Sequence, residues 1–236
     1  MLVNQDDRSF ARICSQLKKD CSIFTIYDIG AHKGEWTKEC SQIFKDIEFH
    51  MFEANPNLED PVNGHSWHNV ALSSNNENRI FYSKNSTGDS FYKEQSIYYE
   101  EEVEELKVRS TTLDDYVALT GIRNPDVIKI DTQGSELDIL SGSKKCLESC
   151  KLLLMEQPIL PYNQGAPSFD QYMSMALSND FIPVGLEEMH VIDGAFVQID
   201  ILFAKKNIYE RFFMKYGWLK ETIPGFSENS SNLLSF

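Results

Sequence analysis

A glycine turn and an acidic residue further along the chain form the first candidate site. The segment Asp28-Ile29-Gly30-Ala31-His32-Lys33-Gly34 follows a β-rich run at residues 23–29 and precedes a helix-like run at residues 35–44. Glycines there let the backbone approach a ligand closely, and N–H groups at a helix start face that ligand. Glu53 follows roughly 20 residues later, after the next β-rich run, where a carboxylate can accept both hydroxyls of a ribose. The two features together predict a nucleoside cofactor.

The spacing of the turn distinguishes between two such cofactors. Dinucleotide-binding folds prefer G-x-G-x-x-G, whose glycines bring the pyrophosphate onto the helix N-terminus. This chain has D-x-G-x-x-x-G instead. Asp28 would repel a pyrophosphate but suits the cationic amino group of a methionine moiety. The pattern therefore favours S-adenosylmethionine (SAM) over a nicotinamide cofactor.

A second candidate site follows two later β-rich runs. Asp131 comes directly after residues 127–130, and Glu156 comes after residues 152–155. Such carboxylates can bind a substrate hydroxyl, accept its proton or hold a divalent cation. Alternatively, Asp131 caps the next helix and Glu136 lies on that helix's exposed face. We expect Asp131 and Glu156 to be catalytic. No Cys/His metal-ligand spacing occurs, so a divalent cation stays an option that the sequence does not predict.

Further polar residues are candidates for acceptor contacts or for a base. A lone histidine is more often structural than catalytic. His190 is nevertheless a candidate base, because we expect it in a turn before the last strand that opens toward the substrate. The predicted substrate contacts come from the segments around these sites and comprise Ser90, Tyr92, Glu136, Gln157, Tyr162 and Asp200.

The elements that must position these residues alternate between strand and helix. Repeated βαβ order with a terminal strand pair predicts one α/β domain with a mostly parallel, doubly wound sheet and an antiparallel edge hairpin. We expect a helical extension at residues 1–22, the domain at 23–206 and a helix with a tail at 207–236. An insertion at about 73–110 contains Ser90–Tyr92 and an acidic run. We interpret the acidic run as a solvated helix face or loop rather than a cation site. Ser90–Tyr92 and the acidic run together would form a lid over the site.

The composition and net charge limit the classes of molecule that we expect this protein to bind. The 22 basic and 36 acidic residues give a net charge of −14, which repels nucleic-acid phosphates and anionic lipid. Apolar runs are far shorter than the roughly 20 residues of a membrane-spanning helix. The five cysteines form no C-x-x-C pair, and the N-terminus does not resemble a signal peptide. We therefore expect reduced thiols and a cytoplasmic protein that acts on a small molecule or glycan, and the oligomeric state stays open.

Six ordered blocks resemble one family. Their order and spacing over residues 23–206 are similar to the FkbM family of SAM-dependent methyltransferases. The blocks are Tyr27-Asp28-Ile29-Gly30-Ala31-His32-Lys33-Gly34, Phe52-Glu53-Ala54-Asn55-Pro56, Asn69-Val70-Ala71-Leu72-Ser73, Thr111-Thr112-Leu113-Asp114-Asp115, Ile128-Lys129-Ile130-Asp131-Thr132-Gln133-Gly134-Ser135-Glu136 and Gln198-Ile199-Asp200-Ile201-Leu202-Phe203.

The resemblance implies a Rossmann-like class I methyltransferase fold that binds SAM. Such enzymes commonly methylate a sugar hydroxyl in a glycan, glycolipid or natural product. The resemblance places Asp28, Gly30 and Gly34 on the methionine side and Glu53 on the ribose, with the turn from Asn69 to Ala71 near adenine. The remaining cofactor positions within these blocks are Ala31, Ala54, Asn55 and Asp131. Many SAM folds have an acid after the third strand, whereas this chain has Ala71-Leu72-Ser73.

Two other functions remain open from the sequence. Intact cofactor residues are also compatible with a SAM-binding scaffold or regulator that does not catalyse methyl transfer. A nicotinamide-dependent oxidoreductase is less favoured, because the turn lacks the middle glycine and carries Asp28.

Overall fold

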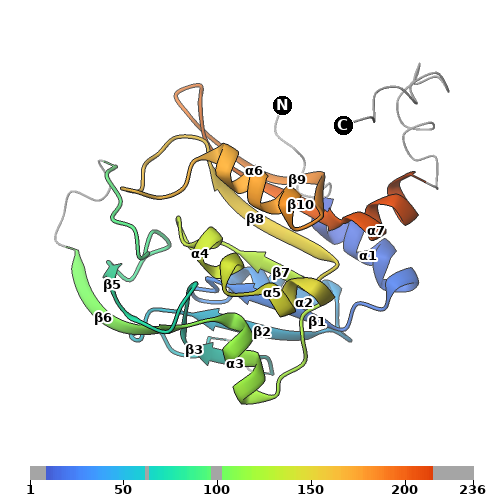
Figure 1. Cartoon of the computed structure of the whole chain (residues 1–236), viewed down its shortest axis with the longest axis horizontal. Helices are drawn as coiled ribbons and strands as arrows, with labels where there is room; N and C mark the ends of the chain where they lie inside the picture. Colours follow the sequence, from blue (N-terminus) through green and yellow to red (C-terminus); the bar gives the residue numbers. More distant parts are fainter. Residues whose placement is uncertain (1–8, 62–63, 97–102, 215–236) are drawn as a thin grey trace.

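A seven-stranded sheet forms the centre of the molecule (Figure 1). The computed structural model describes residues 9–61, 64–96 and 103–214. The strand order is β3-β2-β1-β7-β8-β10-β9. All neighbours from β3 to β8 are parallel, and β10 runs antiparallel to both β8 and β9. The strands are β1 (Thr25–Ile29), β2 (Glu48–Glu53), β3 (Ser66–Asn69), β7 (Val127–Ile130), β8 (Leu152–Pro158), β9 (Phe181–Ile192) and β10 (Ala195–Lys205).

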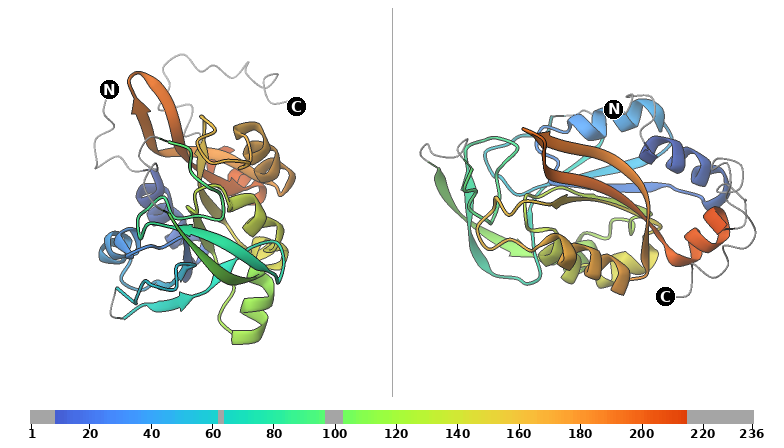
Figure 2. Two further views of the ribbon diagram at one scale, coloured as in Figure 1. Left: turned by 90° about the vertical axis from the view of Figure 1, so that its left-hand side faces the viewer. Right: turned by 90° about the horizontal axis from the view of Figure 1, so that it is seen from above.

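Helices cover both faces of this sheet. The view from above in Figure 2 shows the blue helices α1 (Ser9–Cys21) and α2 (Glu35–Ile43) on one side. The helices between residues 113 and 178, coloured from green to light orange, lie on the other side. The order of elements and the two covered faces confirm the predicted doubly wound class I architecture with its antiparallel edge hairpin. The remaining helices are α3 (Leu113–Thr120), α4 (Glu136–Ser141), α5 (Lys144–Ser149), α6 (Phe169–Ser178), α7 (Lys206–Ile208) and the π-helix η3 (Tyr209–Met214).

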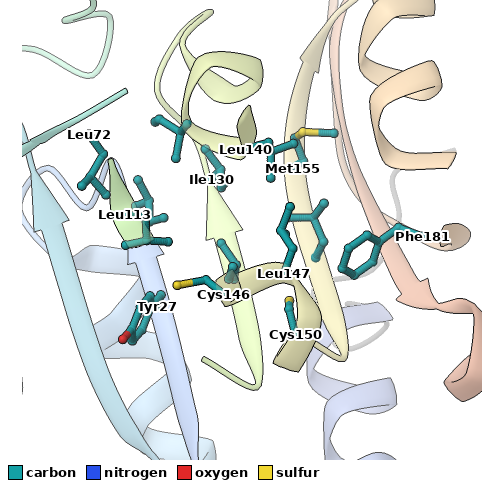
Figure 3. Packing of buried hydrophobic residues seen from close by; sticks show 14 of the residues in the cluster. Tyr27, Leu72, Leu113, Ile130, Leu140, Cys146, Leu147, Cys150, Met155 and Phe181 are labelled. Atoms are coloured by element: carbon teal, nitrogen blue, oxygen red, sulfur yellow. The ribbon is translucent and has the colours of Figure 1, made fainter. Parts of the chain in front are cut away.

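The central strands are buried on both faces, which fits their nearly continuous apolar sequences. On β1, Ile26 belongs to a core with α1 and α2, and Tyr27 belongs to a core with α3, α5 and α6. Successive side chains of a strand point to opposite faces, so one short strand supplies both cores. Figure 3 shows the second core, in which Tyr27, Cys146 and Phe181 pack between the sheet and these helices.

The insertion forms a sheet of its own, which the sequence did not predict. β6 (Glu104–Thr111) pairs antiparallel with β5 (Asn78–Ser83) and parallel with β4 (Ala71–Leu72). The acidic run was expected to be a helix face or a loop. Residues 97–102 lie outside the described part, but Glu104 and Glu105 begin a strand. Their side chains are exposed, and pairing with β5 outweighs the low strand preference of glutamate.

The edge hairpin corrects the expected position of His190. This residue lies within β9, and the turn comes later, at Asp193-Gly194. Both turn residues have positive φ angles, 50° and 82°. Such a two-residue turn matches the twist of its strands, and Asp-Gly is a favoured sequence for it. β9 therefore continues beyond His190, where the sequence analysis expected the turn.

The two ends of the chain are described in part. The leading helix expected at residues 1–22 is α1, and the expected C-terminal helix is present as α7 and η3, up to Met214. Residues beyond 214 lie outside the described part, and the domain bounds stay a prediction. No helix in the described ranges is long and apolar enough to cross a membrane.

Candidate functional site

The glycine turn after β1 touches the loop after β7. Gly30 has a φ of 78°. A Cβ atom on Gly30 would lie 1.8 Å from the backbone oxygen of Asp131, so only glycine fits there. The backbone N–H groups of Gly30 and Ala31 donate to the Phe52 carbonyl, at 2.9 and 3.1 Å. The ends of β1, β2 and β7 are thereby held together, and Gly34 begins α2 on the same side.

Glu53 is the buried carboxylate at the end of β2. One oxygen, Oε2, accepts a hydrogen bond from the His32 backbone at 2.8 Å, and Oε1 accepts one from the Asn55 backbone at 2.7 Å. Burial raises the pKa of Glu53, although both N–H groups oppose this. Each oxygen has a further lone pair, so the carboxylate can accept two hydroxyl groups.

These residues border a cleft, which we call the inner cleft, with about 550 Å³ of empty space that is partly open to solvent. Its floor carries Gly30, Glu53 and Asp131. Its apolar lining includes Phe52, Val70, Leu72, Phe81, Phe91 and Ile139, and the insertion adds Ser86, Thr87 and Asp89. A close backbone approach, a carboxylate and an apolar wall suit a nucleoside.

A second, wider groove adjoins the inner cleft, and we call it the outer groove. Ser86 and Thr87 line both spaces. The outer groove also contains Gln133, Tyr162 and Gln198, and its far side includes Ile192 and Val197 from the hairpin. Its polar lining comes from amides and hydroxyls, which can both donate and accept hydrogen bonds, and from the charged residues Lys84, Glu94 and Glu104.

A hydrogen-bonded line connects the two spaces. The Gln133 amide donates to Asp131 Oδ1 at 3.2 Å and to Glu156 Oε1 at 2.7 Å. The Gln198 amide donates to Glu156 Oε2 at 2.7 Å, and the Tyr162 hydroxyl lies 2.7 Å from Gln198 Oε1. Asp131 lines the inner cleft, and the other end of this line reaches the outer groove. The structure thus brings together Asp131, Glu156 and Tyr162, which the sequence analysis had selected separately.

The sequence analysis missed two residues of this line. Gln133 and Gln198 both stand in quoted blocks, but they received no role. Gln133 has a positive φ of 55°. The sequence does not indicate this conformation, because the glycine that usually adopts it is the next residue. Gln198 approaches Glu156 only because β10 pairs with β8. A long-range strand pairing leaves no local signal in the sequence.

Lys129 links the acids of β1 and β7. Its Nζ lies 3.2 Å from Asp28 and 3.3 Å from Asp131. Burial opposes the charge, but the two carboxylates raise the pKa of Lys129 above its usual range. Asp28 is completely buried and also accepts a hydrogen bond from Thr37 at 2.7 Å. Asp28 therefore orients Lys129, and its contact with a methionine amino group stays a prediction.

One acid of this line, Glu156, and one acid beside it, Asp200, have raised pKa values. Burial, followed by the charges of Asp131 and Asp200, raises the pKa of Glu156 well above its usual range. Burial and the charge of Asp131 raise the pKa of Asp200 to about 7. Asp200 pairs with Glu156 in the sheet register, so the carboxylates share one face. The described residues contain no cluster of three or more His, Cys, Asp or Glu side chains that could hold a metal ion.

Glu136 organises the turn after β7 from behind. Its carboxylate accepts hydrogen bonds from the Thr132 and Gly134 backbones and from the Tyr172 hydroxyl, the first at 2.8 Å and the last at 2.7 Å. Glu136 is 1% exposed, so the alternative that it lies on an exposed helix face is wrong. The carboxylate faces the protein interior because it binds these donors.

The insertion holds the same turn from outside. The Ser90 hydroxyl lies 2.8 Å from the Gln133 carbonyl, and the Tyr92 hydroxyl donates to Asp138 at 3.2 Å. The Tyr92 ring covers Gly134. Phe91, which lies between Ser90 and Tyr92 in the sequence, lines the inner cleft. The predicted contacts Ser90 and Tyr92 therefore support the wall to which Phe91 belongs.

At the turn after β3, the residues that line the inner cleft are sequence neighbours of the predicted cofactor residues Asn69 and Ala71. Val70 and Leu72 line the inner cleft, whereas Ala71 packs against Phe81 and Phe91. Asn69 donates to the Asn55 carbonyl at 2.8 Å. Side chains alternate between two sides of an extended chain, which explains the shift by one residue. Ala54 lines the cleft, and Asn55 is buried, with its amide bonded to Asp89 of the insertion.

The remaining predicted residues lie further from both spaces. His190 is partly exposed on β9, 3.3 Å from Glu188. Gln157 is completely buried at the end of β8, on the sheet face opposite Glu156. Neither these residues nor Asp200 belong to the lining of the inner cleft or the outer groove. Their predicted roles stay predictions.

Comparisons with known proteins add one family match. A family model described as the methyltransferase FkbM domain matches residues 28–183, more than half of the chain. No curated protein sequence matches.

Several solved structures are similar to this chain at low sequence identity. A magnesium protoporphyrin IX methyltransferase from Synechocystis PCC 6803 with bound SAM is 8% identical, over 85% of this chain and 80% of that chain, with a TM-score of 0.44. A precorrin-6y C5,15-methyltransferase from Geobacter metallireducens GS-15 is 12% identical, over 78% and 82%, with a TM-score of 0.41. TrmK of M. capricolum with S-adenosylhomocysteine is 13% identical, over 77% and 62%, with a TM-score of 0.43.

Proposed function

The chain belongs to the FkbM methyltransferase family and uses SAM as its methyl donor, and we propose that it transfers the methyl group to a hydroxyl of a sugar. The observation that carries this proposal is the hydrogen-bonded line from Asp131 through Gln133 to Glu156. It joins a cleft suited to a nucleoside with a polar groove suited to a hydroxylated acceptor.

The residues of the inner cleft fit SAM. Glu53 would accept the ribose hydroxyls, and the backbone at Gly30 and Ala31 would face the methionine part. Val70, Leu72 and the other apolar side chains would enclose the base. When bound, SAM supplies an electrophilic methyl group on a sulfonium sulfur.

Asp131 is the proposed acceptor for the proton of the sugar hydroxyl. Its side chain is 33% exposed and lines the inner cleft, and it is hydrogen-bonded to Gln133, which lines the outer groove. The Lys129 ammonium lies 3.3 Å from the other carboxylate oxygen, Oδ2. The Gln133 amide fixes one oxygen through a hydrogen bond, which leaves the other to meet the hydroxyl and the ammonium. Alignment of the groups together with this acceptor is sufficient for a methyl transfer that needs no covalent intermediate.

The outer groove supports a sugar as the acceptor. Gln133, Tyr162 and Gln198 present amide and hydroxyl groups close together. A ring with several hydroxyls can exchange hydrogen bonds with such groups. The net charge of −14 disfavours a polyphosphate or nucleic-acid acceptor. We also expect a cytoplasmic location, because Cys14, Cys40, Cys146 and Cys150 are buried free thiols.

Calorimetric titration of the wild type, Glu53→Ala and Asp131→Asn with S-adenosylhomocysteine tests the cofactor site, with NADH as the comparison. We expect the wild type and Asp131→Asn to bind S-adenosylhomocysteine. Glu53→Ala should bind roughly 100-fold more weakly, because it loses charge-assisted hydrogen bonds to the ribose. Binding of NADH alone would favour an oxidoreductase and contradict the proposal.

Transfer of labelled methyl from SAM to a panel of sugars and glycosides tests the reaction. We expect an O-methyl product with the wild type and roughly 100-fold slower transfer with Asp131→Asn. Full activity in Asp131→Asn would reject Asp131 as the proton acceptor. Tight S-adenosylhomocysteine binding without transfer to any sugar would contradict the proposed acceptor and favour a SAM-binding scaffold.

A further inference from the structure

Ser135 is a buried serine in the wall of the inner cleft. It lies at the N-cap of α4, with φ −91° and ψ 2°, and its side chain makes no capping hydrogen bond. The residue is 2% exposed and belongs to the cleft lining. Its Oγ has no hydrogen-bond partner among the described residues. A buried hydroxyl without a partner is costly, so it indicates a bond that forms with a ligand.

The other buried serines of the described part show that Ser135 differs from them. Each of the others hydrogen-bonds through its hydroxyl: Ser73, Ser83, Ser90, Ser110 and Ser143. Ser143 is the closest counterpart, because it is also an N-cap, of α5, and is 1% exposed. Its hydroxyl donates to the Ile139 carbonyl. The local position of a serine at a short helix start therefore does not explain the unpaired Oγ of Ser135.

Another residue holds the turn before α4. The Glu136 carboxylate accepts hydrogen bonds from the N–H groups of Thr132 and Gly134. These bonds do not use the Ser135 hydroxyl. The backbone position of Ser135 is fixed by its neighbours, since Ser90 and Tyr92 of the insertion hold the turn from the other side.

The position of Ser135 in the cleft indicates which part of the cofactor it meets. If the ribose lies on Glu53 and the methionine part lies near Gly30 and Asp131, the base occupies the remaining apolar part. That part includes Ile139, which is one helical turn after Ser135, and Leu72. The segment Ala71-Leu72-Ser73 offers no carboxylate to an adenine, and the Ser73 hydroxyl accepts a hydrogen bond from Arg79.

We propose that the Ser135 hydroxyl hydrogen-bonds the purine base of the cofactor and contributes to nucleoside recognition. A serine hydroxyl both donates and accepts, so it can meet a ring nitrogen or the exocyclic amino group. This inference rests on the proposed seating of SAM in the inner cleft, and it assigns the base a polar partner within an otherwise apolar wall.

The test compares Ser135→Ala with Ser143→Ala. Each is titrated with S-adenosylhomocysteine and with 5′-methylthioadenosine, which keeps the nucleoside but lacks the amino-acid part. Thermal unfolding without a ligand is measured in parallel. We expect Ser135→Ala to bind both ligands roughly threefold to tenfold more weakly. Its unfolding temperature should equal or exceed that of the wild type, because no protein hydrogen bond is lost. Ser143→Ala should unfold at a lower temperature and keep both affinities.

Different outcomes separate this inference from the proposed function. Wild-type affinity of Ser135→Ala for both ligands would overturn the role of Ser135 while the cofactor site stands. Weaker binding of S-adenosylhomocysteine alone would place the hydroxyl on the amino-acid part and would overturn the assignment to the base. A wild type that binds neither ligand would overturn the proposed seating of the cofactor itself.

Discussion

The inner cleft and the outer groove adjoin each other, but different kinds of chemical groups line them. The inner cleft is formed by strand ends, backbone atoms and apolar side chains, and one of these side chains, Leu72, also belongs to the packed core (Figure 3). The outer groove is formed by loop and hairpin side chains that hydrogen-bond one another. A site made of backbone and core suits one invariant ligand. A site made of loop side chains can change its acceptor without disturbing the fold.

The carboxylates of the two regions differ in the same way. Glu53 of the inner cleft is held by two backbone N–H groups, which lower its pKa against the effect of burial. Glu156 is held by side-chain amides and lies near Asp131 and Asp200, which raise its pKa further. The inner acid is stabilised by fixed dipoles, whereas the acids beside the outer groove repel one another. Variants should therefore affect the two regions by different amounts.

The largest effect should come from the backbone of the inner cleft. Gly30→Ala should lower the free energy of unfolding by about 3 kcal/mol or more, because its Cβ would overlap the Asp131 carbonyl. Gly121→Ala is the matched control, since Gly121 has a similar φ of 70° but nothing within 4 Å of an added Cβ. It should lose only about 1–2 kcal/mol from the positive φ.

Denaturant unfolding of both glycine variants measures this difference. If Gly30→Ala is no less stable than Gly121→Ala, the contact between the turns after β1 and β7 is not required for the fold. The inner cleft would then be less rigid than its backbone contacts indicate.

A smaller and more selective effect is expected in the outer groove. Tyr162→Phe removes the hydroxyl 2.7 Å from Gln198. We expect kcat/KM for the sugar acceptor to fall roughly threefold to tenfold, while the affinity for S-adenosylhomocysteine stays unchanged. Tyr116→Phe is the matched control, because its hydroxyl, 3.0 Å from His68, belongs to neither space. Equal losses of cofactor affinity and acceptor turnover in Tyr162→Phe would contradict the division into two regions.

A further effect is a pH dependence of stability caused by Asp200. Its pKa rises from 3.8 to about 7, because of burial and the charge of Asp131. Between these pH values the folded state binds the proton and the unfolded state does not, so stability should fall as the pH rises through this window. Asp200→Asn should therefore reduce this fall and be more stable than the wild type at pH 8.

Thermal unfolding of wild type and Asp200→Asn at pH 5 and pH 8 measures this effect. The two proteins should differ more at pH 8 than at pH 5. If they show the same dependence on pH, the carboxylates near the outer groove do not repel one another in the folded protein.

Local patterns predicted the inner cleft well. The residues Gly30, Glu53 and Asp131 end neighbouring parallel strands, and they do border one cleft. At the turn after β3, Val70 and Leu72 line the cleft, whereas the cofactor roles of Asn69 and Ala71 stay predictions. The direction of each side chain in an extended segment depends on where pairing begins, and a short apolar run does not specify that point.

The outer groove was predicted less completely. Asp131, Glu156 and Tyr162 were selected as single residues, whereas Gln133 and Gln198 were missed. The expected turn at His190 was wrong, since β9 continues to Ile192. Asp193-Gly194 carried the turn signal, and only the pairing of β9 with β10 shows how far both strands extend.

The sequence by itself determined the alternation of strands and helices, the glycine turn after β1 and the acids that end β2 and β7. Each depends on local chemistry: apolar periodicity, the conformational freedom of glycine and the end of a strand. Only the tertiary structure decided that β10 places Gln198 on Glu156, that the insertion covers the turn after β7 and that the Ser135 hydroxyl has no hydrogen-bond partner in the part of the chain that the structure describes. These features join residues far apart in the chain, and their contacts exist only once the sheet has brought those segments together.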